Sequence, residues 1–584
     1  KGVIAVFLKK IPNKRSGRTF LSIVEGYRDP NTGKVRHRTV QALGYLDELE
    51  KEHEDPIAHF TEVAKEMTKL DKELNTPIMF SFTPLDKIDD SAWLRKNLGF
   101  SVLSAIYHEL EIHKFMANRQ RSLKTDFLLN DVFKMLVFLG ILEPGSKKKS
   151  FERKGAYFER FDFSLMDVYR SLTLLHKYKD ALLVHLHEQV SMKYGRDTSN
   201  VFYDVTNYYF EIDEPDNLRK KGVSKEHRPN PIVQMGLLVD QGGIPITYRL
   251  FSGNTNDCIT LLPILADLKE SYNIDRMVVV ADRGINTGEN IAYNLIKGDG
   301  YIYSQSIRGA QKSFKNYVLN EKGYVEHENG FKIKSRVYPR EIWVTNVEDE
   351  RVKVPIDEKQ VVFYSPDYAK KAKAERAFAI EKAKALINNP GMYNQATSYG
   401  ASKYVRGLVY DKKTGEILTA GRHLMLDLEK IAEEEKYDGY YAIVTSELNM
   451  PDYDVIDTYR GLWRIEESFR VTKSDLETRP VYVSREDHIE AHFLTCFTAL
   501  LILRLLEVRT KRTYSPSTII NELRQVTGTY LSENYYMFDH FNPRVKVIGE
   551  SVGIDFSKRF MSLGEVKKII ASTKKGAVSQ QLSE

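Results

Sequence analysis

The segment Asp457–Lys473, DTYRGLWRIEESFRVTK, decides how the rest of the chain is interpreted. It has no Gly or Pro after Gly461, which predicts a helix. At 100° per residue, one stripe of this helix carries two aromatic residues, a carboxylate and two cations, namely Tyr459, Trp463, Glu466, Arg470 and Lys473. Such a face suits a phosphate backbone and a metal ion. The alternative is a solvated charged face with i, i+4 pairs.

Two further acids lie at informative places upstream. Asp204 lies inside the predicted strand Val201–Phe210, where an acid is costly unless it is paired or bound to metal. Asp282 ends the apolar run in Arg276–Gly284, where side chains emerge from a sheet. The alternatives are an Asp204 carboxylate bonded to backbone and an Asp282 that caps the Asp-Arg-Gly turn.

The predicted order from residue 199 is a strand, a β-hairpin, a helix, a strand, a helix and a strand. The hairpin turns at Asp240–Gly243, and the last strand begins at Gly300. A three-strand meander followed by helix–strand units predicts a ribonuclease H topology. The fold class is therefore α/β, with a ribonuclease H-like catalytic core interrupted by a β-rich insertion, a helical N-terminal region and a small N-terminal β-unit.

These patterns divide the chain into six regions. They are a basic β-unit at 1–50 that is a candidate for DNA-end binding, a helical domain at 51–198 for DNA binding or dimerisation, the first part of the core at 199–307, the β-rich insertion at 308–436, the second part of the core at 437–512, and a C-terminal region at 513–584 for dimerisation or DNA contact. The alternative for the β-unit is a soluble hairpin without a DNA-binding role. The tail after about Val566 is predicted to be mobile.

Composition excludes several classes of protein. The 584 residues are 42% hydrophobic and 28% charged, which is ordinary for a globular protein with a large core. Two cysteines exclude a disulfide scaffold and a Cys-based zinc module, and they suit the cytoplasm. The longest apolar run, Phe493–Leu506, is too short for a membrane span and predicts a core helix, so no membrane partner is expected.

Three carboxylates from different elements suit hard divalent cations. Neighbouring carboxylates repel one another, and cations remove that repulsion. Oxygen ligands without a nearby thiolate favour Mg²⁺ or Mn²⁺. Two such ions about 4 Å apart activate a nucleophile and stabilise the leaving oxygen in a displacement at phosphorus.

The motifs resemble those of a known family. Tyr459, Arg464, Glu466 and Lys473 lie in a segment similar to the Tyr-Arg-Glu-Lys signature of DDE transposases of the bacterial insertion-sequence 4 superfamily. Tyr-Asp204-Val-Thr-Asn and Ala-Asp282-Arg-Gly resemble the family's first and second acids. Gly222–Gln234 is similar to the segment after the first acid, and Leu43–Leu49 resembles the branch typified by insertion sequence 1634. The resemblance spans about residues 30 to 510.

The resemblance implies a ribonuclease H-like core that holds Asp204, Asp282 and Glu466 with two Mg²⁺ ions. It implies cut-and-paste transposition, often through a hairpin at the transposon end, with Tyr459 and Lys473 on phosphates of that end. One position departs from the signature, because Leu462 replaces the arginine three residues after the tyrosine. Arg460, Arg464 and Arg470 are candidates to replace it, and helix phase favours Arg470.

Basic segments fit a DNA substrate. The loop after the first acid carries cations that suit backbone phosphates, and the alternative is a solvated loop. Trp463 is a candidate for stacking on an unpaired base, and the alternative is helix-to-sheet packing. The expected DNA contacts are Tyr459, Trp463, Arg464, Arg470, Lys473, Arg219, Lys220, Lys221, Lys225, Arg228 and Arg283.

The sequence is therefore interpreted as that of a DNA transposase. We expect metal-dependent cleavage of transposon ends and strand transfer into target DNA, with double-stranded terminal inverted repeats and target DNA as partners. Two ends must be handled, so a homodimer on paired ends is expected. Two alternatives are a ribonuclease H-like nuclease or resolvase without strand transfer, and a catalytically silent DNA-binding protein derived from a transposase.

Overall fold

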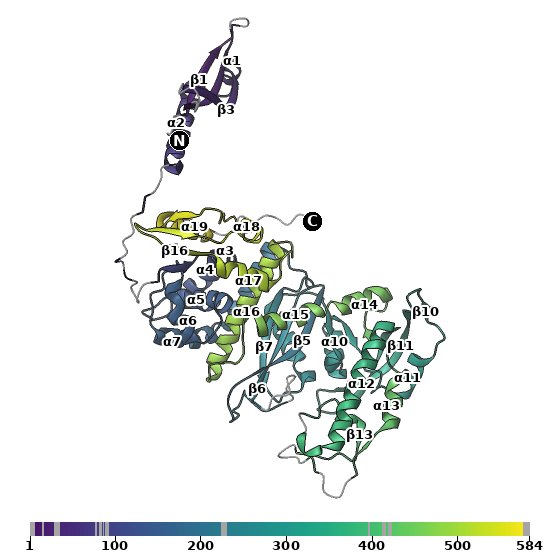
Figure 1. Cartoon of the computed structure of the whole chain (residues 1–584). Coiled ribbons are helices and arrows are strands. Elements are labelled where there is room, and N and C mark those ends of the chain that lie inside the picture. Colours follow the sequence, from purple (N-terminus) through teal and green to yellow (C-terminus); the bar gives the residue numbers. More distant parts are fainter. Residues whose placement is uncertain are drawn as a thin grey trace. The chain divides into compact units, whose positions relative to one another are not determined.

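A computed structural model describes residues 6–13, 17–28, 35–75, 79–80, 85, 87, 93–222, 230–394, 397–410, 416–418 and 423–575. The chain forms two compact units, Lys1–Asp90 and Ser91–Glu584, each described by itself below. The structure is mixed α/β, with a large mixed sheet and many helices (Figure 1).

The first unit is a three-stranded antiparallel sheet with a helix packed on it. The order is β1–β2–β3, and the elements are β1 (Val6–Pro12), β2 (Thr19–Arg28), β3 (Val35–Tyr45), α1 (Leu46–Leu49) and α2 (Pro56–Asn75). Thr68 of α2 hydrogen-bonds to both the N–H and the carbonyl of Val6. Helix α2 therefore belongs with the strands, so the predicted division at residue 50 does not follow this unit.

The centre of the second unit is a mixed sheet of nine strands in the described residues, in the order β10–β11–β12–β15–β9–β8–β5–β6–β7. The predicted sequence of elements from residue 199 is confirmed. It comprises β5 (Asn200–Tyr209), β6 (Ile232–Val239), β7 (Pro245–Ser252), α9 (Leu261–Ser271), β8 (Val278–Ala281), α10 (Gly288–Ile296) and β9 (Gly300–Ser304). Strands β5, β6 and β7 form an antiparallel meander, and β8 and β9 run parallel to β5. The four residues of β8 are all buried, as their apolar sequence requires.

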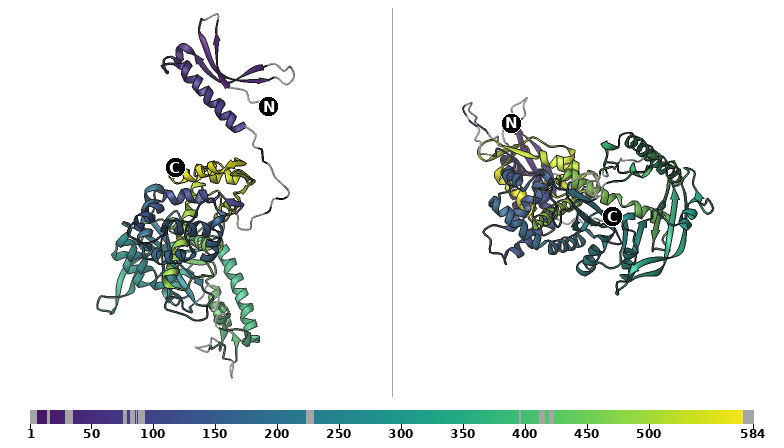
Figure 2. Two further views of the ribbon diagram at one scale, coloured as in Figure 1. Left: turned by 90° about the vertical axis from the view of Figure 1, so that its left-hand side faces the viewer. Right: turned by 90° about the horizontal axis from the view of Figure 1, so that it is seen from below.

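The predicted insertion continues this sheet. It holds α11 (Lys312–Leu319), β10 (Val325–Glu326), β11 (Lys332–Thr345), β12 (Arg351–Tyr364), α12 (Pro366–Asn388), β13 (Val405–Arg406), β14 (Met425–Leu426) and α13 (Leu428–Glu435). Strand β12 pairs with β15 (Tyr440–Thr445), which pairs with β9. Figure 2 shows α12 extending along one side of this part of the unit. The insertion is therefore both helical and β-rich, and it is not a separate unit.

The opposite end of the sheet is covered by helices (Figure 1). They are α3 (Phe100–Glu109), α4 (Ile112–Gln120), α5 (Leu129–Leu142), α6 (Lys147–Arg153), α7 (Leu165–Lys177) and α8 (Lys179–Tyr194), followed late in the chain by α17 (Pro516–Gln525) and α18 (Pro543–Glu550). A small sheet, β18 (Phe560–Ser562), β17 (Tyr535–Phe538), β16 (Thr527–Tyr530) and β4 (Arg95–Asn97), joins the C-terminal region to this layer.

The C-terminal tail differs from its prediction. Helix α19 (Leu563–Thr573) begins with a capping box between Ser562 and Glu565 and buries Val566 and Ile570. Ser104 of α3 hydrogen-bonds to Thr573 at 2.9 Å. The apolar stripe of α19 is short and lies in a segment with many Lys and Ser residues, so composition did not predict the helix. The prediction of a mobile tail is wrong for the residues up to Lys575.

One long helix ties the helical layer to the sheet. Helix α16 (Glu486–Arg509) packs Phe493 against Tyr208 of β5 and Phe497 against Tyr248 of β7. Among the described residues it is the one helix long and apolar enough to cross a membrane, but 89% of that window is buried inside the fold. It is the predicted core helix.

A buried ion cluster fixes a neighbouring helix to α16. Arg504 lies 2.7 Å from the Glu507 carboxylate and 3.4 Å from that of Glu467, and its Nη2 donates to Ser468 Oγ at 3.0 Å. Glu467 and Ser468 belong to α15 (Trp463–Arg470), which also carries Glu466. Burial raises the pKa of Glu507 even with Arg504 beside it. The cluster therefore fixes α15 to α16. Removing one of its charges would leave another buried charge unpaired, which is strongly destabilising.

We predict that Arg504→Met lowers the free energy of unfolding by about 3 kcal/mol in urea denaturation, because Glu507 then lacks its cation. The folded-state pKa of Glu507 rises further in this variant, so the deficit shrinks as the pH is lowered and the Glu507 carboxyl becomes neutral. Arg485→Met, at an exposed ion pair with Asp487, is the control and costs less than about 1 kcal/mol. Equal stability of Arg504→Met and the wild type contradicts this role.

Candidate active site

The register of the parallel strands places two of the predicted acids side by side. Tyr203 of β5 pairs with Ala281 of β8, and Asp204 and Asp282 are the next residues on each strand. Neighbouring strands lie about 4.8 Å apart, and residues at matching positions emerge on the same face. The two carboxylates therefore come together because both strands carry an acid one residue after the last pair. Asp204 is half-buried and Asp282 is exposed.

The third acid comes from a helix that the sequence analysis described incorrectly. The predicted single helix over Asp457–Lys473 is broken into α14 (Asp452–Arg460), α15 (Trp463–Arg470) and the π-helix η6 (Val471–Asp475). Gly461, which lies at this break, packs closely against the sheet. A Cβ on Gly461 would lie 2.5 Å from Cζ of Phe202, a buried residue of β5. Glycine thus allows the corner between α14 and α15 to approach the strand that carries Asp204.

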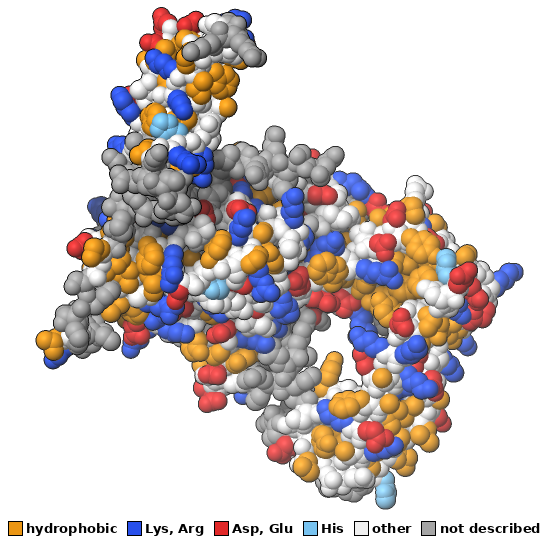
Figure 3. Space-filling view, turned by 45° about the horizontal axis from the view of Figure 1, so that its top comes forward, with side chains coloured by type: hydrophobic (Ala, Val, Ile, Leu, Met, Phe, Trp, Pro, Cys, Tyr) orange, Lys and Arg blue, Asp and Glu red, His pale blue; other side chains and the backbone are white. Residues whose placement is uncertain are grey.

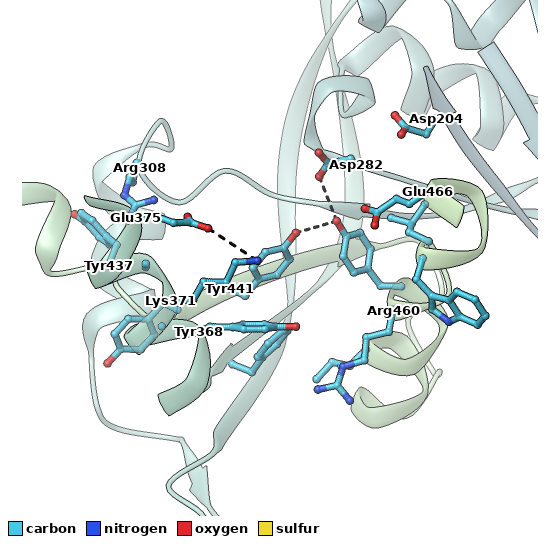
Figure 4. Close-up of a pocket in the computed structure, with 18 of the residues that line it drawn as sticks. Asp204, Asp282, Arg308, Tyr368, Lys371, Glu375, Tyr437, Tyr441, Arg460 and Glu466 are labelled. Carbon is cyan, nitrogen blue, oxygen red and sulfur yellow. Dashed lines mark hydrogen bonds and ion pairs between the residues drawn. The ribbon is translucent and has the colours of Figure 1, made fainter. Parts of the chain in front are cut away.

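All three acids line one pocket of about 680 Å³. Figure 4 shows Asp204, Asp282 and Glu466 at one end of it, with Arg308, Tyr437 and Lys371 at the other. The first group belongs to the core and the second to the region of the insertion. Figure 3 shows the second unit hollowed beside the insertion, with basic and hydrophobic side chains along the rim. The pocket therefore combines carboxylates with cations and aromatic rings.

The Asp282 carboxylate is held by hydroxyl groups. Ser304 Oγ donates to Asp282 Oδ1 at 2.7 Å, and the Tyr459 hydroxyl donates to the same oxygen at 3.2 Å. Tyr441 bonds to the Tyr459 hydroxyl at 2.9 Å. Burial, with help from Tyr441 and Asp282, raises the pKa of Tyr459 well above its ordinary value, so this phenol keeps its proton and remains a donor. Glu466 is exposed, and its carboxylate accepts no hydrogen bond from the part of the chain that the structure describes.

The donor set is chemically suited to a hard divalent cation, because it consists of carboxylate oxygens without a thiolate or imidazole in the pocket lining. Within the described ranges no group of three His, Cys, Asp or Glu side chains lies close enough to hold one ion. The residues present are therefore of the chemical type that binds a hard divalent cation.

The predicted DNA contacts around Glu466 fall into two groups, which are the residues that line the pocket and the residues that contact rings or carboxylates of the protein itself. Tyr459 and Trp463 line the pocket, and Trp463 is 51% exposed, so it is not packed between helix and sheet. Arg464 lies over the Phe202 ring, and burial lowers its pKa. Arg470 lies 3.8 Å from the Glu467 carboxylate and 3.5 Å from that of Asp475. Lys473 lies 5.8 Å from the centre of the Tyr208 ring.

Three arginines are candidates to replace the one missing at Leu462. Leu462 and Arg460 line the pocket, whereas Arg470 is absent from the lining and binds two acids. The guanidinium of Arg460 points away from the three carboxylates in Figure 4 and pairs with Asp457 at 3.2 Å. Replacement of the signature arginine by Arg470 stays a prediction.

The remaining predicted contacts lie near the ends of the core strands. Arg219 is bonded to Asp216 at 2.6 Å, Lys220 pairs through its backbone with Ile232, and Lys221 is exposed. Arg283 is exposed and lines a second hollow of about 330 Å³ that shares Asp282 with the first. Lys225 and Arg228 lie outside the described residues.

Several residues of the site lie on strands and helices other than those that carry the three acids, and the sequence patterns did not predict them. Ser304 ends β9, and Tyr441 is in β15. A serine or tyrosine in a strand has no sequence signal until strand pairing is known. Arg308, Tyr368 and Lys371 also line the pocket. The charged pattern of Tyr368–Asn388 predicted a helix but not the face that it presents.

Two family models match the chain. The model described as "IS1634 family transposase, N-terminal domain" matches residues 8–77, and the model described as "Transposase DDE domain" matches residues 218–502. The second match includes Asp282 and Glu466 and begins after Asp204. The chain is a DDE transposase. The first match falls within the first compact unit, and together the matches describe an IS1634-like transposase.

No curated protein matches the chain. Among solved structures, the transposase has a likeness to the "Cryo-EM structure of piggyBac transposase synaptic complex with hairpin DNA", with 8% identity and a TM-score of 0.35 over 82% of this chain and 85% of that chain. A likeness of this size does not show a common fold. The family matches themselves imply that the transposase binds DNA and uses divalent metal ions.

We predict that Gly461→Ala lowers the free energy of unfolding by about 1 to 3 kcal/mol, because the added methyl group overpacks the contact with Phe202. DNA cleavage falls as well, since α15 carries Glu466. Urea unfolding and a nicking assay measure the two effects. Gly391→Ala is the matched control, because a Cβ there meets nothing within 4 Å. A Gly461→Ala variant with wild-type stability and activity contradicts the proposed packing constraint.

Proposed function

We propose that this transposase cuts the ends of its transposon and joins the freed 3′-hydroxyl groups to target DNA. The observation that carries the proposal is the convergence of Asp204, Asp282 and Glu466, from two neighbouring strands and a helix, on one pocket. The order of the meander β5–β6–β7 and the parallel strands β8 and β9 supports a ribonuclease H-like core. The Tyr-Arg-Glu-Lys-like segment supports placement in the insertion-sequence 4 superfamily.

Two Mg²⁺ or Mn²⁺ ions are proposed, and Asp204, Asp282 and Glu466 would hold them. When bound, such ions favour deprotonation of the attacking hydroxyl or water and stabilise the leaving oxygen. The chain's own residues position the reaction. Asp282 is oriented by hydroxyl donors, Glu466 is free to adjust on an exposed helix face, and Trp463 offers a stacking surface beside the acids.

The cations of the pocket suit the DNA backbone. Arg308, Lys371 and Arg460 line the same hollow as the acids, and Arg283 lines the adjoining one. Phosphate contacts of this type fix register without reading sequence. We assign Trp463, Arg283 and Lys221 to DNA contact. The bonds of Arg219 and Arg470 to carboxylates, and the packing of Arg464, make these three weaker contributors.

We further propose a homodimer on paired transposon ends, because one reaction joins two ends and the pocket holds one set of acids. The proposed substrates are double-stranded terminal inverted repeats and target DNA in the cytoplasm, and the proposed route is cut-and-paste transposition. The first unit is proposed to read the ends through its basic strands.

We predict that Asp204→Asn, Asp282→Asn and Glu466→Gln each reduce cleavage of a DNA fragment carrying the element's ends by more than about a hundredfold, a loss above that typical of supporting residues. Binding of the same fragment in a gel-shift assay is retained. Asp454→Asn, at an exposed acid of α14 outside the pocket lining, is the control for charge removal. Cleavage that survives in the three acid variants would falsify the assignment.

A strand-transfer assay separates transposition from plain hydrolysis. A pre-cut end with a 3′-hydroxyl is expected to become joined to plasmid DNA in the presence of Mg²⁺, whereas the same end with a 3′-dideoxy terminus is not, because the nucleophile is missing. Efficient nicking of both substrates without joined products favours the nuclease or resolvase reading. No nicking of any DNA with Mg²⁺ or Mn²⁺ favours a silent DNA-binding protein.

A further inference from the structure

Asp282 differs from the other two acids in how its orientation is fixed. Strand register gives it a different neighbour on each side. The β8–β9 pairing ends at Ala281 and Tyr303, so Asp282 and Ser304 are the next residues on adjacent strands. The β5–β8 pairing places Asp204 on the other side. The Asp282 carboxylate thus lies between Asp204 on one side and the Ser304 hydroxyl on the other.

The hydroxyl side is a connected network. Ser304 is 3% exposed, and its Oγ donates to Asp282 Oδ1 at 2.7 Å. Tyr459 donates to the same oxygen, and Tyr441 bonds to Tyr459 (Figure 4). Both bonds that reach this carboxylate from described side chains end on Oδ1. The network therefore restricts rotation of the carboxylate, and Oδ2 receives no hydrogen bond from a described side chain.

The network comes from three elements that pack on one another. Ser304 ends β9, Tyr441 lies near the start of β15, and Tyr459 is on α14. Strands β9 and β15 pair at Ser304 and Ile443, so their positions are linked by backbone hydrogen bonds. The rings of Tyr441 and Tyr459 lie 5.8 Å apart. An orientation set by a paired strand and a packed helix is more rigid than that of a side chain on an exposed helix face.

We propose that Ser304 and Tyr441, the latter acting through Tyr459, are positioning residues that orient Asp282 toward a divalent cation. The proposal rests on the proposed function, in which Asp282 is a ligand. Residues that hydrogen-bond to a metal ligand orient it, and their loss typically costs 10- to 100-fold in metal affinity or activity. Glu466 lacks such support from the described residues, so the Asp282 side of the site binds the cation more tightly.

The test measures the affinity of the full chain for Mn²⁺ in the absence of DNA. Electron paramagnetic resonance gives the concentration of free Mn²⁺ during the titration. Ser304→Ala is expected to weaken the tighter Mn²⁺ site by about 10- to 100-fold. Tyr441→Phe is expected to weaken it less, by about 3- to 10-fold, since its hydroxyl acts through Tyr459. Ser304→Thr keeps a hydroxyl donor and is expected to restore most of the affinity.

Two matched controls lie beside the network. Ser306→Ala removes a hydroxyl two residues further on, whose contact is to the N–H of Gly309. Tyr440→Phe removes the neighbouring phenol, which donates to Glu321. Both are expected to bind Mn²⁺ as the wild type does. Thermal melting of each variant shows whether it is folded. If Ser304→Ala does not fold, Tyr441→Phe provides the test instead, because Tyr441 is only half-buried.

The outcomes separate this inference from the proposed function. If Asp282→Asn loses the tighter Mn²⁺ site while Ser304→Ala and Tyr441→Phe bind like the wild type, Asp282 is a ligand and the positioning inference is wrong. If Asp282→Asn itself binds Mn²⁺ normally, the proposed function fails first. Weakened binding in Ser304→Ala and Tyr441→Phe, with normal controls, supports the inference.

Discussion

The parallel register of β5, β8 and β9 is the constraint on which the active site depends. Because Tyr203, Ala281 and Tyr303 occupy matching positions, the residues that follow them, Asp204, Asp282 and Ser304, form a row across three strands. A shift of one residue in either pairing would break this row and turn one acid to the other face. Fully buried strands such as β8 hold the register through packing on both faces.

The third acid reaches this row through close packing of a helix corner. Gly461 permits contact with Phe202, and Arg504 secures α15 from the core helix α16. The site thus joins two carboxylates from neighbouring strands to one on a helix. The insertion then supplies Arg308, Lys371 and several tyrosines to the same pocket. Carboxylates for metal chemistry and cations for DNA come from different parts of the chain.

Sequence patterns predicted the core well because its strands are short, apolar and separated by clear turns. Asp204 and Asp282 were found because acids are out of place in or next to apolar strands, and Glu466 because it shares a face with aromatic and basic residues. The failures have tertiary causes. Gly461 packs against Phe202 between α14 and α15, so the segment predicted as one helix forms two. Ser304 and Tyr441 could not be recognised as site residues before the strand pairing was known. Helix α2 joins the first unit through Thr68, and no change of composition near residue 50 indicates this contact.

We propose that Asp204, Asp282 and Glu466 together hold the two divalent cations of the DNA-bound transposase. Anomalous diffraction from crystals grown with Mn²⁺ and a DNA end would locate these ions. Two peaks are expected among the three carboxylates, each next to a DNA phosphate. A single ion away from Asp204, or ions bound elsewhere in the pocket, would contradict this proposal.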